Sequence, residues 1–91
     1  MSLASEVTTR QEPDPGPSPD GVPAVRFRTR VRTNAEVGRF KRRLEHLGLL
    51  PLAETIDRYT TNWLWSGTGQ GYEILWRDTT TFADLLPLAR L

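Results

Sequence analysis

Residues 24–33 alternate strictly between side chains that suit a buried surface and side chains that carry charge. One parity is apolar or β-branched, and the other consists of arginines: Arg26, Arg28, Arg30 and Arg32. Successive side chains of a strand point to opposite faces of a sheet, so this period of two predicts a strand with one buried face. We call these four residues the arginine ladder and expect it to line the uncovered face of a sheet.

A helix is expected directly after this strand. Thr33 and Glu36 have the spacing of a capping box, which marks a helix start. An apolar stripe follows at steps of three and four residues: Val37, Phe40, Leu44 and Leu47. Gly48 should end the helix. On the side away from the stripe lies a secondary basic cluster, formed by Arg39, Arg42 and Arg43 together with His46.

Two further strands are expected at residues 55–66 and 72–77, joined by a glycine-rich turn over residues 66–71. Pairing Trp65 with Tyr72 places Trp63 beside Ile74 on an aromatic core face. The predicted core therefore contains Phe40, Leu44, Trp63 and Ile74. The opposite face of the hairpin would carry Thr60, Asn62, Leu64 and Leu75.

Residues 79–91 predict a short helix whose apolar side is formed by Phe82, Leu85 and Leu86. Pro87 should break or kink this helix, because proline lacks the amide hydrogen and clashes with the preceding turn.

Residues 1–23 contain five of the seven prolines and a net negative charge. Because they offer little apolar surface to bury, we expect a disordered, acidic, proline-rich tail. Residues 24–91 would then form one small α+β domain.

The expected order is strand, helix, strand, strand, helix. A right-handed crossover makes the first two strands parallel, and the third can lie between them, antiparallel to both. This is a two-layer β-α-β-β-α arrangement, a split β-α-β that corresponds to half of a ferredoxin-like fold. The first and second strands would be its edges.

Charge is unevenly distributed along the chain. The net charge is +1, yet residues 24–43 contain eight basic residues against one acidic residue. The ladder repeats at roughly 6.6–6.8 Å, two strand residues each, which is close to the spacing of phosphates along a nucleic-acid strand. Its arginines could alternatively be solvated charges that deter edge aggregation, or they could face an acidic protein or this chain's own carboxylates, such as Glu12.

Several kinds of catalytic or ligand-binding site need residues or motifs that this sequence does not offer. There are no cysteines and one histidine, so thiol catalysis, disulfides and Cys- or His-rich metal sites are not expected. The glycine run precedes a strand rather than the helix that a phosphate loop requires. No apolar run is long enough to cross a membrane. We expect a cytoplasmic protein without metal, cofactor or enzymatic activity.

The remaining function class is binding. We expect a small adaptor module that forms a homodimer or docks on a protein partner through Thr60, Asn62, Leu64 and Leu75, because a small sheet with an open edge favours pairing with a partner. The alternative is a nucleic-acid-binding accessory protein that uses the arginine ladder.

Overall fold

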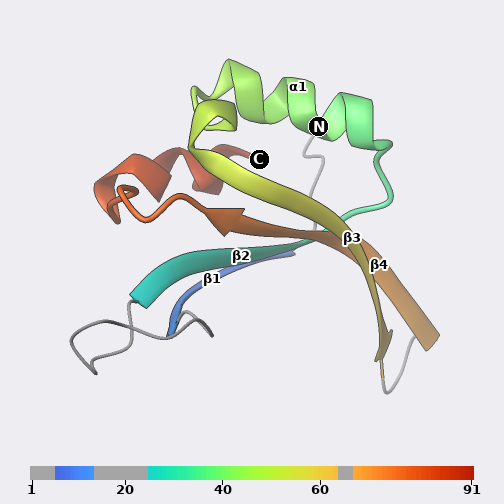
Figure 1. Ribbon diagram of the computed structural model, residues 1–91. Coiled ribbons are helices and arrows are strands. Elements are labelled where there is room, and N and C mark those ends of the chain that lie inside the picture. The colour runs from blue at the N-terminus through green and yellow to red at the C-terminus, as the bar shows by residue number, and fades with distance from the viewer. Residues whose placement is uncertain (1–5, 14–24, 64–66) are drawn as a thin grey trace.

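The computed structural model describes residues 6–13, 25–63 and 67–91. Within these residues the chain is a small α+β fold whose strands form one sheet, with the helices on one side of it (Figure 1). In chain order the elements are β1 (Glu6–Pro13), β2 (Val25–Arg32), α1 (Val37–His46), the 3₁₀-helix η1 (Leu50–Leu52), β3 (Ala53–Trp63), β4 (Gly67–Trp76) and the 3₁₀-helix η2 (Ala83–Arg90).

The sheet has four strands in the order β1-β2-β4-β3, and all neighbouring strands are antiparallel. β4 therefore lies between β2 and β3, and these two strands run parallel to each other, joined through α1. This agrees with the arrangement expected for the three strands. The edges are β1 and β3. The expectation that β2 is an edge is wrong, because β1 covers it.

The strand β1 lies within residues 1–23, for which the sequence predicts a disordered tail. Glu6–Pro13 pairs with β2 along its whole length, from Glu6 opposite Arg32 to Pro13 opposite Val25. The prediction of disorder is thus wrong for this stretch. The prediction considered only the burial of apolar surface. β1 instead gains backbone hydrogen bonds to β2, whose donors and acceptors on that side would otherwise lack partners. The rest of the predicted tail, residues 1–5 and 14–23, lies outside the described residues.

The β3–β4 hairpin has a different register from the expected one. Tyr72 lies opposite Arg58 rather than Trp65, and Ile74 lies opposite Ile56 rather than Trp63. Moving from 65 to 58 is a shift by an odd number of residues, so each β3 side chain changes face. Gly67, Gly69 and Gly71 belong to β4, so the predicted turn is wrong for residues 67–71, and Ser66 lies outside the described residues.

Gly71 has a physical reason to be a glycine inside β4. A Cβ atom on Gly71 would collide with the carbonyl oxygen of Val31 on β2. Only glycine allows the two backbones to approach this closely. Position 71 therefore requires a glycine within the strand, although the glycine run suggests a turn in the sequence.

The core lies between the sheet and the helices. Its buried members are Val31, Phe40, Leu44, Leu49, Tyr72, Ile74, Trp76, Leu85, Leu88 and Leu91. The Phe40 ring stacks on the Tyr72 ring with centroids 4.6 Å apart. The predicted core positions Phe40, Leu44 and Ile74 are confirmed as buried. The predicted core side chain of Trp63 lies outside the described side chains.

The ends of α1 differ in how well the sequence predicts them. Gly48 follows the helix with a φ of 74°, as expected of a C-terminal glycine. The predicted capping box does not form, because Glu36 is the N-cap and makes no side-chain cap hydrogen bond. Thr33 instead accepts a hydrogen bond from the Ala35 amide through Oγ1, 3.1 Å away. Val37 is exposed, so the buried stripe begins at Phe40.

The C-terminal helix is a 3₁₀-helix with Pro87 inside it. Side chains three residues apart align in a 3₁₀-helix, and the buried leucines follow this period: Leu85, Leu88 and Leu91. The predicted apolar side is wrong for Phe82 and Leu86, which are exposed. For Leu86 the assumed α-helical period caused this error, whereas Phe82 precedes the 3₁₀-helix as its N-cap.

Candidate interaction surfaces

The arginine ladder lies on the sheet face away from α1 and η2. Thr29 and Val31, which alternate with the arginines along β2, are fully buried on the helix side. The cross-strand partners of the ladder share its face: Leu75 lies opposite Arg28, and Glu73 lies opposite Arg30. This uncovered position agrees with the sequence-based expectation.

Glu73 joins two ladder arginines. Its Oε1 accepts from Arg28 Nη1 at 3.1 Å, and its Oε2 accepts from Arg30 Nε at 2.9 Å. The hydrogen bond with Glu73 is also the main cause that raises the pKa of Arg30. Each pair alone contributes little near the surface. Together they direct two guanidinium groups towards one carboxylate.

β1 supplies a second carboxylate. Glu12 Oε2 lies 3.4 Å from Arg28 Nε. Arg28 therefore lies between an acidic residue of β1 and one of β4. Among the alternatives for the ladder, pairing with the chain's own carboxylates is what the described residues show.

Arg26 is tied to the end of the sheet. Its Nη2 donates to Glu54 Oε2 at 2.6 Å, and its Nε and Nη2 both donate to the carbonyl oxygen of Trp76. The side chain is only 14 % exposed. Arg26 thus links β2 to the last residue of β4 and to β3. The fourth ladder residue, Arg32, is half-buried.

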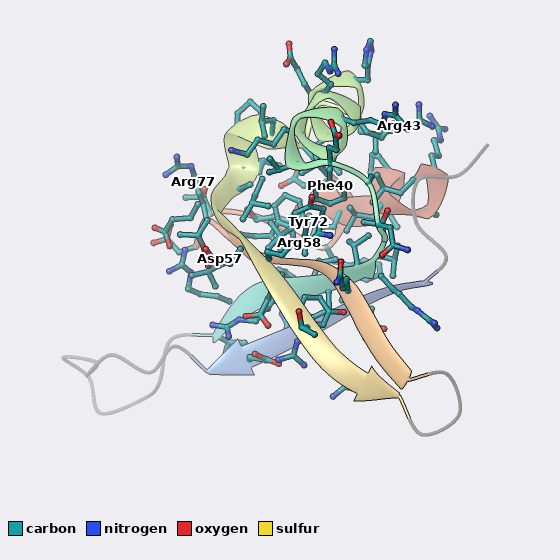
Figure 2. All side chains as sticks on the ribbon, turned by 90° about the vertical axis from the view of Figure 1, so that its right-hand side faces the viewer. Phe40, Arg43, Asp57, Arg58, Tyr72 and Arg77 are labelled. Carbon is teal, nitrogen blue, oxygen red and sulfur yellow. The ribbon has the colours of Figure 1, made fainter. Side chains whose placement is uncertain are left out.

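The secondary basic cluster has a different environment. Arg39 and Arg42 are exposed on α1, while Arg43 is half-buried and donates from Nη2 to the Arg90 carbonyl oxygen at 2.9 Å. Within the described part of the chain, none of the three forms an ion pair with a carboxylate. Since α1 packs on the core side, this cluster and the ladder lie on opposite sides of the fold, as expected. Figure 2 shows Arg43 on the helix side, beside η2.

The predicted interface residues do not share one face. Thr60 pairs with Gln70 and lies on the same face as Arg58 and Tyr72, whereas Leu75 lies on the ladder face beside Arg28. The grouping of Leu75 with Thr60 is therefore wrong, and the register shift of the hairpin is the reason. Asn62 belongs to β3, but its side chain is outside the described ones, and Leu64 lies outside the described residues altogether.

The far end of the hairpin extends past β2. β2 pairs with β4 only from Gly71 to Leu75, so Gly67–Gln70 has β3 as its single strand neighbour in the described sheet. Figure 1 shows the ends of β3 and β4 projecting beyond the other strands. We call Thr60–Trp63 and Gly67–Gln70 the distal ribbon.

Arg58 of β3 has a role that no pattern in the sequence indicates. Arg58 Nη1 donates to Tyr72 Oη at 2.6 Å and to the Ala35 carbonyl oxygen at 3.2 Å. Its Nη2 donates to Gln70 Oε1 at 2.8 Å. Tyr72 Oη also donates to the Ala35 carbonyl oxygen. These contacts connect the segment before α1 to the sheet, and only the correct register reveals them.

The described residues contain no group of three or more side chains suited to hold a metal ion. None of the helices described is long and apolar enough to cross a membrane. No protein-family model matches the chain, and the searches of curated proteins and of solved structures found no significant match either.

Proposed function

We propose that this chain is a non-enzymatic binding module that pairs an extended strand of a protein partner, or of a second copy, with the edge of β3. The observation that carries the proposal is the position of β3, an eleven-residue strand at the edge of the sheet. An edge strand presents unpaired N–H and C=O groups along one side, and adding a strand is a common mode of peptide recognition.

Charge divides the β3 edge into two parts. Glu54, Asp57 and Arg58 lie in its first half, whereas Tyr59–Trp63 carries no charge. Proteins commonly protect edges against pairing with charged side chains. The second half, which belongs largely to the distal ribbon, lacks this protection and is the part we assign to the partner.

A relation to half of a ferredoxin-like fold fits the same proposal. β2, α1, β3 and β4 follow the split β-α-β order, and β1 adds an antiparallel strand beside β2. In this arrangement β3 stays an edge, so the partner strand would extend the sheet at that side.

The proposal is tested with Thr60→Lys, because a lysine on an edge strand opposes pairing. Thr79→Lys, at an exposed position in the loop before η2, is the matched control. Light scattering over a concentration series should show an association of the parent protein that Thr60→Lys weakens and Thr79→Lys leaves unchanged. A parent that stays monomeric throughout would reject self-association and leave docking on a different protein. Equal association of both variants would remove β3 from the interface.

Nucleic-acid binding by the ladder is the second candidate, favoured by four arginines on one uncovered face. The carboxylates of Glu73 and Glu12 compete with phosphates for Arg28 and Arg30. If the ladder binds nucleic acid, Glu73→Gln should raise the affinity for single-stranded DNA and steepen its salt dependence. An unchanged affinity and salt slope would reject this role.

A further inference from the structure

Two adjacent charged residues of β3, Asp57 and Arg58, lie on opposite faces of the sheet at its edge. Arg58 pairs with Tyr72 on the helix side, and Asp57 pairs with Glu73 on the ladder face. Both side chains are exposed. Figure 2 shows Arg58 beside Tyr72, with Asp57 on the other side of the β3 ribbon. A strand added at this edge therefore meets a positive charge on one face and, at the next residue, a negative charge on the other.

Arg58 is held in place without a carboxylate. Its Cζ atom lies 4.9 Å from the centroid of the Tyr72 ring. Its hydrogen bonds go to neutral oxygens of Tyr72, Ala35 and Gln70. A guanidinium has five N–H groups, so Nε and one hydrogen of Nη2 have no partner among the described residues. Because these contacts fix the guanidinium, it is preorganised to bind a carboxylate from outside the chain.

The charge of Asp57 is also unbalanced. Within the described part of the chain, its carboxylate forms no hydrogen bond or ion pair. Glu73, directly opposite, is bonded to Arg28 and Arg30. Like charges opposite each other on neighbouring strands oppose pairing. A cation on the outer side of Asp57 would offset this repulsion.

A second copy of β3 cannot match these two charges. Residues opposite each other in an antiparallel pair share a face of the sheet. Two copies of β3 paired in this way keep their helix sides together, so Arg58 of one copy never lies opposite Asp57 of the other. A different strand can match both charges if an acidic and a basic residue follow each other in its sequence. Charge complementarity therefore favours a different protein over a second copy.

We propose that the β3 edge selects an extended segment of a protein partner in which uncharged, β-branched residues are followed by an acidic and then a basic residue. This inference rests on the proposed addition of a strand at β3. The segment runs antiparallel to β3, as all neighbouring strands of the described sheet do. Its uncharged residues pair with Tyr59–Trp63, its acidic residue lies opposite Arg58, and its basic residue lies opposite Asp57. The two charges fix the register and exclude segments with the reverse order.

The test uses the full chain and two fluorescent synthetic peptides of identical composition. In the first, a short run of alternating Val and Thr ends in Glu-Lys, and in the second the same run ends in Lys-Glu. Fluorescence anisotropy should show that the Glu-Lys peptide binds about tenfold more tightly, because two cross-strand pairs change from opposite to like charge. High salt should reduce this difference. NMR should show that the bound peptide shifts the amide signals of β3.

Asp57→Lys separates the effect of charge from strand addition. Asp57 makes no described side-chain contact, so this variant should fold. It should lose the preference for the Glu-Lys peptide and bind most tightly a third peptide that ends in Glu-Glu. Asp78→Lys, at an exposed position in the turn after β4, is the matched control with the same change in net charge. It should keep the preference of the parent protein.

The outcomes distinguish this proposal from the strand addition on which it rests. If both peptides bind equally and Thr60→Lys weakens both, charge selection is overturned and the β3 edge stays the binding site. Peptide binding that Thr60→Lys leaves unchanged would reject the β3 edge itself. Absence of binding by either peptide, a preference for the Lys-Glu order, or an unchanged preference in Asp57→Lys would also overturn charge selection.

Discussion

Glycine positions show how strongly local surroundings decide the effect of one side chain. Gly71 faces the backbone of Val31, where an added Cβ would collide with a carbonyl oxygen. Gly38, in α1, has nothing within 4 Å of the same added atom. Both glycines lie inside regular elements, where the residue type alone predicts a similar loss of stability.

The two alanine substitutions should therefore change stability in opposite directions. Gly71→Ala forces β2 and β4 apart and should lower the free energy of unfolding by about 1–3 kcal/mol, the usual range for overpacking. Gly38→Ala should raise it by up to about 1 kcal/mol through helix propensity. Urea denaturation measures both. A Gly71→Ala protein as stable as the parent would show that the two strands are not packed as closely as described.

Phe40 and Val37 form a second contrast on α1. Phe40 is fully buried and stacked on Tyr72, whereas Val37 is 47 % exposed. Phe40→Ala should cost about 3–5 kcal/mol by leaving a cavity, which is a large part of the stability of a small domain. Val37→Ala should change stability by less than about 0.5 kcal/mol, as at other surface sites. Thermal unfolding distinguishes them, and similar melting of both variants would contradict the packing of α1.

At the scale of elements, β1 is the strand most weakly connected to the rest. None of the β1 side chains that the structure describes, those of residues 7–12, belongs to the hydrophobic core. Besides the backbone pairing and the Glu12–Arg28 pair, β1 has a hydroxyl contact of 2.9 Å between Thr9 Oγ1 and Thr29 Oγ1. Trp76 Nε1 donates to the same Thr29 oxygen at 2.7 Å. β1 should open locally without unfolding the domain, because few buried contacts resist it.

Amide exchange tests this behaviour of β1. Its amides should be protected but should exchange faster than those of β2 and β4. Thr9→Val should accelerate exchange in β1 and leave the global melting temperature nearly unchanged, because Trp76 keeps its hydrogen bond to Thr29. Loss of protection in all strands together would mean that β1 is part of the cooperative core.

Side-chain periodicity is sufficient to predict two of the elements, β2 and α1. The alternation of β2 and the stripe of Phe40 and Leu44 predict a strand and a helix, because each element buries one face and its side chains repeat with its geometry. Hairpin register has no such local signal. The expected register places Trp63 opposite Ile74 and the observed register places Ile56 there, so apolar pairing at this position does not distinguish the two.

At the scale of the whole molecule, the distal ribbon is the part with the least support. Beyond Gly71, the described sheet consists of β3 and β4 alone. An isolated two-stranded ribbon is only marginally stable in water. A partner strand at the β3 edge would therefore stabilise the distal ribbon more than the rest of the sheet.

The protection of the distal ribbon against amide exchange should therefore depend on protein concentration. At low protein concentration, the amides of Thr60–Trp63 should exchange faster than those of Ile56 and Asp57, where β2 supports the sheet through β4. If β3 edges pair between copies, protection of the ribbon should rise with concentration while that of β2 stays constant. Protection that is independent of concentration would contradict pairing between copies.

The properties that depend on near neighbours in the chain could be predicted from the amino-acid sequence. These are the alternating strand with arginines on its uncovered face, the buried stripe of α1, its end at Gly48, and the two basic surfaces on opposite sides. They follow from side-chain periodicity and backbone preference, which are local.

The features that depend on contacts between distant segments could not be predicted in this way, because they arise when the folded chain brings those segments together. Glu6–Pro13 becomes a strand because β2 offers it an unpaired edge. Arg58 joins the helix side because Tyr72 lies opposite it. The ladder loses much of its free charge because Glu73 and Glu12 come from other strands. Each of these contacts joins residues far apart in the chain, and no local pattern encodes them.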